Sequence, residues 1–503
     1  MPKLTALSKN RHTGPSCTRR EMLAVSGMSL AAALGVGASD FVNSNKSKTP
    51  NVIVFLADSL RADHLGCYGY SKATSPRIDE MAESSLLFEH CYSQCCWTKP
   101  SISSLFSGYV PRVHQAVLSN WDASILDNWS PDKAENHKVQ VLRDNFDLLA
   151  EAFQGIGSQT ALFQTNPHCQ EQFGFTRGFD FYRYVLAQDP RGQVNEVLHW
   201  LRRQPENPFF LFVHEMDPHG PYIPEPSFYK ELTGRFPDDV QAKLSEEDLD
   251  ILNGLKTRYW PDTPRFDMRR LRELSAQAHE HLVNLYDAEI RGVDYHFGRL
   301  LDCLASSGLE DNTIVAFISD HGEAFGEHGL FTHNNSLFEE ELHVPLIIRM
   351  ANAGAGARVP WDVSLFDLFP TLATLVGAGS AEGMQAKSLL TADGKVLPDD
   401  QRPVCSYFDR NQPDTSAWLF SVIQDGYKVI DYAEIRDPEI YDRENDKADQ
   451  NNLYGKIGNS ETLVANARAL RKEHSVLAEK FGPPEYAGMD TETMEGLRAL
   501  GYI

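Results

Sequence analysis

Two aspartates stand directly after apolar segments that have the composition of buried strands. Asp58 follows residues 51–57, and Asp320, with His321 beside it, follows residues 313–319. Carboxylate and imidazole groups at such positions are ligands for a divalent cation. A single aspartate after a strand often only caps a helix. Two such strands with an adjacent histidine favour a metal site instead.

A third apolar segment, residues 209–213, ends at His214 and is followed by Asp217 and His219. Ligands of parallel sheets bind at the carboxyl ends of the strands. We therefore expect the three segments to deliver their polar residues to one rim of a sheet.

The segment Trp97-Thr98-Lys99-Pro100-Ser101-Ile102 lies between these strands, and its Pro-Ser pair suits the first turn of a helix. The amino end of a helix presents N–H groups and a positive dipole end, which favour an anion. Lys99 and Arg61 are candidate cations for holding that anion, although both could face solvent or form structural ion pairs.

The elements that position these residues alternate between strands and helices. Helical patterns over residues 75–84 and 287–304 separate the apolar segments, and the chain of 503 residues with 42% hydrophobic content can bury a large core. This alternation predicts an α/β fold with a mostly parallel central sheet flanked by helices.

The domain organisation follows from changes in composition. After a polar linker at residues 39–50, a catalytic domain is expected over residues 51–385. Within it, residues 223–285 form a charged, helix-rich insert that is either a lid beside His219 or a solvated decoration. Residues 386–503 contain short strand patterns and predict a small α+β subdomain.

The first 38 residues have the features of a twin-arginine signal peptide. Arg19 and Arg20 precede an uncharged stretch from Met22 to Ala38, with a small-residue cleavage site near Ala38. A membrane anchor is the alternative, but the stretch is shorter than the roughly 20 residues that a spanning helix needs. We expect export by the twin-arginine machinery, a periplasmic or secreted location, and no stable membrane span after cleavage.

The net charge excludes some partners. It is −23 for the whole chain and becomes −27 without residues 1–38, because five basic residues and one acidic residue are removed. Nucleic acid is therefore not an expected partner. Seven of the eight cysteines remain, and a structural or disulfide role is favoured over a metal site for Cys91, Cys95 and Cys96.

Several motifs occur in the order found in the sulfatase family of the alkaline-phosphatase superfamily. They are Asp58 with Arg61-Ala-Asp-His-Leu-Gly-Cys-Tyr-Gly69, Pro100-Ser101 closing at Ser107-Gly108, Gly174-Phe-Thr-Arg-Gly-Phe-Asp180, Asp217-Pro-His-Gly-Pro-Tyr222, Ser319-Asp-His-Gly-Glu323 through Gly326-Glu-His-Gly329, Val344-Pro-Leu-Ile-Ile348 and Leu500-Gly-Tyr-Ile503. From about residue 50 to its end, the chain resembles a sulfatase-like enzyme with the alkaline-phosphatase-like fold.

This resemblance implies roles for particular residues. Asp58, Thr98, Asp320 and His321 would bind one divalent cation (Ca, Mn, Mg or Zn), and Thr98 would be the nucleophile. Sulfatases usually have Cys-X-Pro-Ser-Arg here, with the first residue oxidised to formylglycine. Thr98 and Ile102 replace the first and last residues of that motif, and Cys95 and Cys96 are out of register, so no formylglycine is expected.

Two histidines are the candidates for proton transfer. We expect His219 and His333 to contact the ester oxygens or to protonate the leaving group. Alternatively, they contribute with Asp217 to a second metal site, or His333 is an ordinary loop histidine. His168, in Asn166-Pro-His168, is a further candidate to approach the pocket, whereas Glu323, Glu327 and His328 are expected to shape their loop.

The threonine bears on the reaction. A phosphorylated threonine can be hydrolysed by water, whereas a sulfated one could be cleared only by attack on sulfur or by elimination. The usual second aspartate is Ser59, which leaves the identity of the cation open. The sequence thus predicts an exported, metal-dependent hydrolase of sulfate or phosphate esters of a small molecule, glycan or lipid. The alternatives are a phospho-group transferase acting on an envelope lipid or glycan and an inactive ester-binding protein.

Overall fold

The strand β1 (Asn51–Ala57) shows why the central sheet is covered on both faces. Its even-numbered residues 52–56 pack in one apolar cluster with the helices α2 (Thr98–Ser107), α5 (Leu149–Gly155) and α12 (Leu368–Val376). Its odd-numbered residues 53–57 pack in another with α1 (Pro76–Ala82), α6 (Pro190–Arg202) and α10 (Ala276–Ser306). A strand buried on both faces needs a continuous apolar run rather than an alternating one. This is the pattern that predicted a central strand here.

The computed structural model describes residues 49–117, 138–185, 190–203, 205, 208–257, 266–350, 356–379, 383–409, 418–433 and 435–488. The predicted signal peptide, most of the linker and the closing Leu500-Gly-Tyr-Ile503 lie outside these residues. The described residues all belong to one compact unit, which includes those of the predicted subdomain 386–503.

Among these residues the central sheet has eight strands. Seven of them run in the same direction, and β10 runs in the opposite direction. In spatial order the strands are β11 (Ala357–Ser364), β2 (Leu86–Tyr92), β10 (His343–Arg349), β7 (Thr313–Ser319), β1, β6 (Phe209–Glu215), β4 (Gln159–Gln164) and β5 (Phe181–Tyr184). The strand β10 is antiparallel to both neighbours. The predicted mostly parallel sheet is confirmed.

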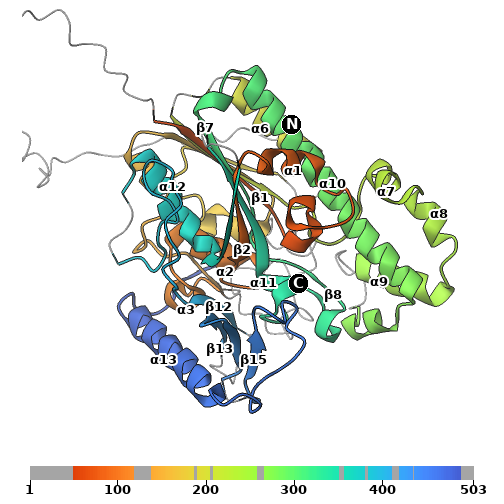
Figure 1. Cartoon of the computed structure of the whole chain (residues 1–503). Helices are drawn as coiled ribbons and strands as arrows, with labels where there is room; N and C mark the ends of the chain where they lie inside the picture. Colours follow the sequence, from red (N-terminus) through yellow and green to blue (C-terminus); the bar gives the residue numbers. More distant parts are fainter. Residues whose placement is uncertain are drawn as a thin grey trace, which may run out of the picture. The chain divides into compact units, whose positions relative to one another are not determined.

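Helices cover both faces of this sheet (Figure 1). Those on the α2 side are α2 (Thr98–Ser107), α3 (Pro111–His114), α5 (Leu149–Gly155) and α12 (Leu368–Val376). Those on the other side are α1 (Pro76–Ala82), α6 (Pro190–Arg202) and α10 (Ala276–Ser306).

The register of the sheet brings the polar residues to one rim. Ala57 of β1 pairs with Glu215 of β6 on one side and with Ser319 of β7 on the other. Asp58 and Asp320 therefore leave the sheet at the same level. His214 differs from the prediction because β6 continues to Glu215, so His214 lies within the strand and not after it.

The residues of the predicted insert are largely helical, and the helix α10 (Ala276–Ser306) spans its far boundary at about residue 285. It contains α7 (Pro226–Thr233), α8 (Pro237–Gln241), α9 (Glu246–Thr257) and a 3-10 helix (Met268–Glu273). The helix predicted over residues 287–304 belongs to α10, which already begins at Ala276. Ser275 caps it, because its side chain accepts a hydrogen bond from the N–H of Ala278.

The C-terminal strand patterns form a second sheet, as predicted. It runs in the order β12 (Val404–Asp409), β13 (Trp418–Gln424), β14 (Tyr427–Asp431) and β15 (Glu439–Asp442), all antiparallel, and it packs with α13 (Ser460–Glu479). Shorter elements are α11 (Glu339–Leu342), the pair β3 (Lys138–Gln140) and β16 (Tyr486–Gly488), and the hairpin β8 (Ala324–Phe325) and β9 (Phe331–Thr332).

Two further features concern the described residues. None of their helices is both long and apolar enough to cross a membrane. The seven cysteines from Cys67 onward all lie in this part of the chain and are unpaired, so the disulfide considered for Cys91, Cys95 and Cys96 is not formed there.

Candidate active site and metal centre

The centre of the site is formed by carboxylates and imidazoles that are fully buried. Ligand atoms of Asp58, His214 and Asp320 lie within 4.8 Å of one another, and these three residues are at most 1% exposed. The pKa of Asp58 is held well below its usual range: burial opposes its ionisation, but the hydrogen bond from His214 and nearby histidine charges outweigh it.

Asp320 shows that the centre suits a cation. Its Oδ1 accepts hydrogen bonds from the N–H groups of Ser59 (3.1 Å) and His321 (3.0 Å), but its Oδ2 accepts none from the described residues. Burial and the charge of Asp58 raise the pKa of Asp320 to about 6. Two buried carboxylates that repel each other, one with a free oxygen, fit a hard divalent cation.

His321 offers a better nitrogen ligand than His214. The Nδ1–H of His321 donates to the carbonyl oxygen of Gly322 (2.9 Å), which leaves the Nε2 lone pair facing Asp58 and Asp320 at 3.5 Å each. In contrast, Nε2 of His214 donates to Asp58 Oδ2 (3.0 Å) and has no lone pair for a metal in this arrangement. His214 therefore orients Asp58.

Thr98 is the first residue of α2 and points its hydroxyl at this cluster. Its Oγ1 lies 3.4 Å from each carboxylate oxygen of Asp58 and 3.2 Å from Nε2 of His321. The side-chain amide of Asn166 lies 3.0 Å from Asp58 Oδ2 and 3.4 Å from the same hydroxyl. The structure thus brings together Asp58, Thr98, Asp320 and His321, the four predicted ligands.

The two predicted proton-transfer histidines also lie here. The ring of His333 is 4.8 Å from that of His219 and 4.5 Å from that of His321. In the hairpin, Ala324 pairs with Thr332, so Glu323 and His333 are neighbours, and the Nδ1 of His333 lies 3.2 and 3.3 Å from the two carboxylate oxygens. Glu323 orients His333.

His219 is neutral at physiological pH. Burial lowers its pKa to about 4, although the charge of Asp58 opposes this. Its Nδ1–H donates to the carbonyl oxygen of Gly220 (2.6 Å), because a carbonyl can only accept. His219 therefore presents its other nitrogen as a base.

The two cations predicted to hold the anion have structural partners. Nζ of Lys99 donates to the carbonyl oxygen of Gln140 and lies 4.7 Å above the ring centre of Phe173, and burial lowers its pKa to about 7. These contacts hold the Lys99 ammonium against the protein. They do not support the role expected for it, which was to bind the anion of the substrate.

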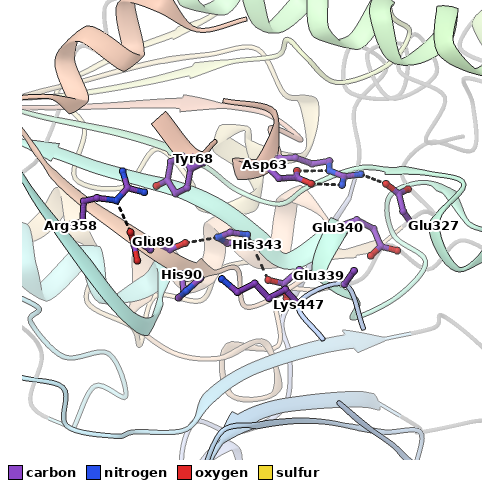
Figure 2. A pocket seen from close by; sticks show the side chains of 12 residues that line it. Asp63, Tyr68, Glu89, His90, Glu327, Glu339, Glu340, His343, Arg358 and Lys447 are labelled. Atoms are coloured by element: carbon purple, nitrogen blue, oxygen red, sulfur yellow. Dashed lines mark hydrogen bonds and ion pairs between the residues drawn. The ribbon is translucent and has the colours of Figure 1, made fainter. Parts of the chain in front are cut away.

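Arg61 likewise forms ion pairs with Asp63 and Glu327, both at 2.7 Å, and donates to the carbonyl oxygen of Glu323. Asp63 and Glu327 line one wall of a cavity of about 410 Å³ (Figure 2). Because these carboxylates neutralise its charge, Arg61 supports the loop that carries Asp320 and Glu323 instead of standing free for an anion.

Sequence reasoning assigned no role to Asn166, placed His214 at the rim without a role in orienting Asp58, and expected Glu323 only to shape its loop. Asn166 is the second residue after β4, just as Asp58 is the first after β1, and this place beyond a strand end could have identified it. His168 is also buried, and burial together with the charge of Lys99 holds its pKa well below its usual range.

A parallel sheet with buried acids, imidazoles and a hydroxyl at one rim defines the class of alkaline-phosphatase-like ester hydrolases. The sulfatase family model matches residues 50–378, more than half of the chain, and a second, described as N-sulphoglucosamine sulphohydrolase, C-terminal, matches residues 326–475. The chain belongs to the sulfatase family. Sulfatases use a divalent metal, in agreement with the buried site found here.

Characterised relatives are similar over most of their length. The N-acetylglucosamine-6-O-sulfatase of Bacteroides thetaiotaomicron is 23% identical, with 84% of this chain and 86% of the relative covered. Human iduronate 2-sulfatase is 25% identical, with 72% of this chain and 75% of the relative covered. These similarities support a sulfatase-like ester hydrolase.

Solved structures show the same fold. The phosphonate monoester hydrolase of Agrobacterium radiobacter superimposes with a TM-score of 0.64 at 20% identity, over 84% of this chain and 96% of that one. A protein solved with its substrate D-glucosamine-2-N,6-O-disulfate gives a TM-score of 0.66 at 19% identity, over 87% and 99%. At these identities the likeness concerns the fold alone.

Proposed function

We propose that this protein hydrolyses phosphate, phosphonate or sulfate esters with the hydroxyl of Thr98 as nucleophile. The observation that carries the proposal is the position of Oγ1, 3.4 Å from both oxygens of Asp58 and 3.2 Å from His321. A hydroxyl in the middle of a cation-binding cluster is in position for activation. The amino end of α2 adds a positive dipole end for the anionic ester.

Asp58, Asp320 and His321, together with Thr98, would hold the cation. When bound, a divalent cation supplies positive charge that lowers the pKa of the Thr98 hydroxyl, whose proton leaves to solvent, and that balances charge on the ester oxygens. Asn166 keeps Asp58 and the hydroxyl in register through its two contacts.

The protein groups then divide the proton transfers between them. In the first step Oγ1 bonds to phosphorus or sulfur, the ester bond to the alcohol breaks, and His333, held by Glu323, gives the alcohol its proton and is then reprotonated from solvent. In the second step a water oxygen bonds to the same atom and Oγ1 leaves. Neutral His219 takes a proton from that water and returns it to Oγ1.

Phosphorus is the favoured reacting atom. A formylglycine hydrate can expel sulfate by breaking its own C–O bond, because a second hydroxyl remains on the same carbon. Thr98 has one hydroxyl and cannot do this. A covalent phospho-threonine is cleared by attack of water on phosphorus, so the threonine is better matched to phosphate and phosphonate esters.

The alcohol part of the substrate is proposed to be a glycan or another small molecule. Its support is the names of the relatives, which act on N-acetylglucosamine and iduronate sulfates. We also propose that Arg19 and Arg20 direct export to the periplasm. Changing both to lysine should keep the chain in the cytoplasm, as followed by cell fractionation, and unchanged export would refute the proposal.

The reaction is tested with the purified protein loaded separately with calcium, manganese, magnesium and zinc. Turnover of an aryl sulfate, a phosphate monoester, a phosphate diester and a phosphonate monoester is compared for the wild type, Thr98→Ala and Thr98→Ser. We expect fastest cleavage of a phosphorus ester, its loss in Thr98→Ala, and its retention in Thr98→Ser.

Cleavage of the aryl sulfate alone, dependent on Thr98, would contradict the preference for phosphorus but keep the nucleophile. Equal turnover by wild type and Thr98→Ala would contradict the nucleophile. Metal binding without turnover of any ester would favour the ester-binding protein, or a transferase that lacks its acceptor.

A further inference from the structure

A second cluster of acids and a histidine lies on the other side of the loop that carries His219. A cavity of about 210 Å³ opens between α6, α7 and α10. Asp217, Glu289 and His296 line it together with Arg191, Glu225 and Phe228. The helices α7 and α10 that border it are seen side by side in Figure 1. The sequence had grouped Asp217 with His219 and His333, but the cavity groups it with α10.

Two buried atoms in this cavity have no hydrogen-bond partner among the described residues. They are Oε2 of Glu289 and Nε2 of His296, and each residue is only 3% exposed. A buried polar atom without a partner destabilises the folded protein, and more so when the group is charged. Such atoms are rare in native proteins and often indicate a missing ligand.

The orientation of His296 is that of a metal ligand. Its Nδ1 is hydrogen-bonded to Oε1 of Glu215 (2.6 Å), its Nε2 has no hydrogen-bond partner among the described residues, and the residue lines the cavity. In metal sites, a carboxylate commonly holds one nitrogen of a histidine while the other binds the ion. Glu215 and His296 have this relationship.

Two of the three carboxylates that line the cavity, those of Asp217 and Glu289, repel each other. Burial and the charge of Asp217 raise the pKa of Glu289 well above its usual range. Arg191 is paired with Glu225 at the edge of the cavity and is more than half exposed, so its charge is directed to that partner. A cation in the cavity would relieve the repulsion between Asp217 and Glu289.

We propose that Asp217, Glu289 and His296 bind a second divalent cation, of the transition-metal type that accepts imidazole and carboxylate together, such as Zn²⁺ or Mn²⁺. This cluster is wider than the catalytic one, since only Asp58, His214 and Asp320 bring three ligand atoms within 4.8 Å among the residues described. Water molecules therefore complete the coordination within the 210 Å³ cavity.

The second site would anchor the loop 217–223, which carries His219. Asp217 lies two residues before His219, and Oε1 of Glu289 accepts a hydrogen bond from the N–H of Ile223. The ion would therefore tie both ends of the loop 217–223 to α10. Its role is to position His219 and not to contact the ester.

The experiment counts and locates zinc in the full chain. The purified protein is stripped with a chelator, reloaded with Zn²⁺ and analysed by mass spectrometry for metal, and crystals of the wild type are examined by anomalous scattering at the zinc edge. The variants are Glu289→Gln, His296→Gln and the double variant Asp58→Asn with Asp320→Asn. Glu280→Gln is the matched control, because it makes the same change at an exposed position of α10.

We expect two zinc ions in the wild type and in Glu280→Gln, and one in each of the other three variants. The wild-type anomalous map should show a peak between Asp217, Glu289 and His296, and zinc should slow hydrogen exchange at the amide of Ile223 except in Glu289→Gln and His296→Gln.

A wild type with one zinc ion, or with a second peak elsewhere, would overturn the proposal. So would two ions in Glu289→Gln, or none in a natively folded double variant. If the variants do not fold, the wild-type map decides the matter by itself. Because the readouts are metal content and position, the result is independent of whether Thr98 is the nucleophile.

Discussion

Two clusters of carboxylates and histidines flank the loop that follows β6, and they differ in spacing and in what faces them. The first, at Asp58 and Asp320, is tight enough to bring ligand atoms within 4.8 Å and faces the hydroxyl of Thr98. The second, at Glu289 and His296, lines a wider cavity and faces no hydroxyl nucleophile among its lining residues. Similar residue types therefore support different tasks.

The difference arises from the elements that close each cluster. At the first, strand ends meet the amino end of α2, which adds both a nucleophile and a dipole for an anion. At the second, Glu289 and His296 from two turns of α10 lie beside Asp217, which follows β6. These residues favour binding of a cation only. The comparison predicts loss of chemistry when the first cluster is changed and loss of positioning when the second is changed.

The largest effect is expected for Thr98→Ala. Removing the nucleophile should lower kcat by a factor of about 10⁴ or more, because the hydroxyl that faces His321 and both oxygens of Asp58 is lost. The neighbouring hydroxyl of Ser59 donates to Asp58 Oδ1 (3.1 Å) and does not take its place at the amino end of α2. Steady-state kinetics with the best phosphorus ester measures this. Thr98→Ser is the control and should stay within about tenfold of the wild type. A kcat of Thr98→Ala close to that of the wild type would mean that water attacks directly.

The next effect is expected for Asp320→Asn. The loss of one carboxylate weakens the catalytic cation, which contributes several kcal/mol to the transition state, so kcat/KM should fall by roughly 10³-fold. Metal analysis of the same sample should show that only the ion of the first cluster is lost. If both ions disappear from a folded protein, the two clusters are not independent.

Much of this first cluster follows from local sequence patterns. The apolar segments before Asp58 and Asp320 form β1 and β7, and parallel pairing carries both aspartates to one rim, as predicted. The Pro-Ser pair correctly indicated a helix, which begins at Thr98 itself. Such features depend on a few consecutive residues, and the sheet then brings them together.

The features that were not predicted depend on distant partners. Arg61 acquires Glu327 as a partner from 266 residues away, and Lys99 finds a carbonyl oxygen 41 residues away. Neither partner can be identified from the residues next to the cation. The end of β6 was misplaced by two residues because His214 and Glu215 are polar, yet both find buried partners, Asp58 and His296.

A moderate effect is expected for His219→Asn, which removes the base of the second step. We expect kcat to fall by about 10²-fold. In the wild type kcat should also fall as the pH drops through about 4, because His219 is neutral above this pKa and becomes protonated below it. The pH profile of the variant should lack this acid limb. An acid limb that persists in the variant, with circular dichroism unchanged, would assign it to another group.

The smallest effect on the reaction is expected for Glu289→Gln. Because Glu289 holds the loop of His219 through the amide of Ile223 and does not face Thr98, kcat should fall by about tenfold or less. The loss should be larger for substrates with good leaving groups, because for them the second step, in which His219 acts, limits turnover. Excess Zn²⁺ should not restore the activity. Comparing kcat for leaving alcohols of graded pKa in the wild type, Glu289→Gln and Glu280→Gln measures this. A loss as large as that of Asp320→Asn would show that the second cluster takes part in the chemistry, and the distinction between the two clusters would then fail.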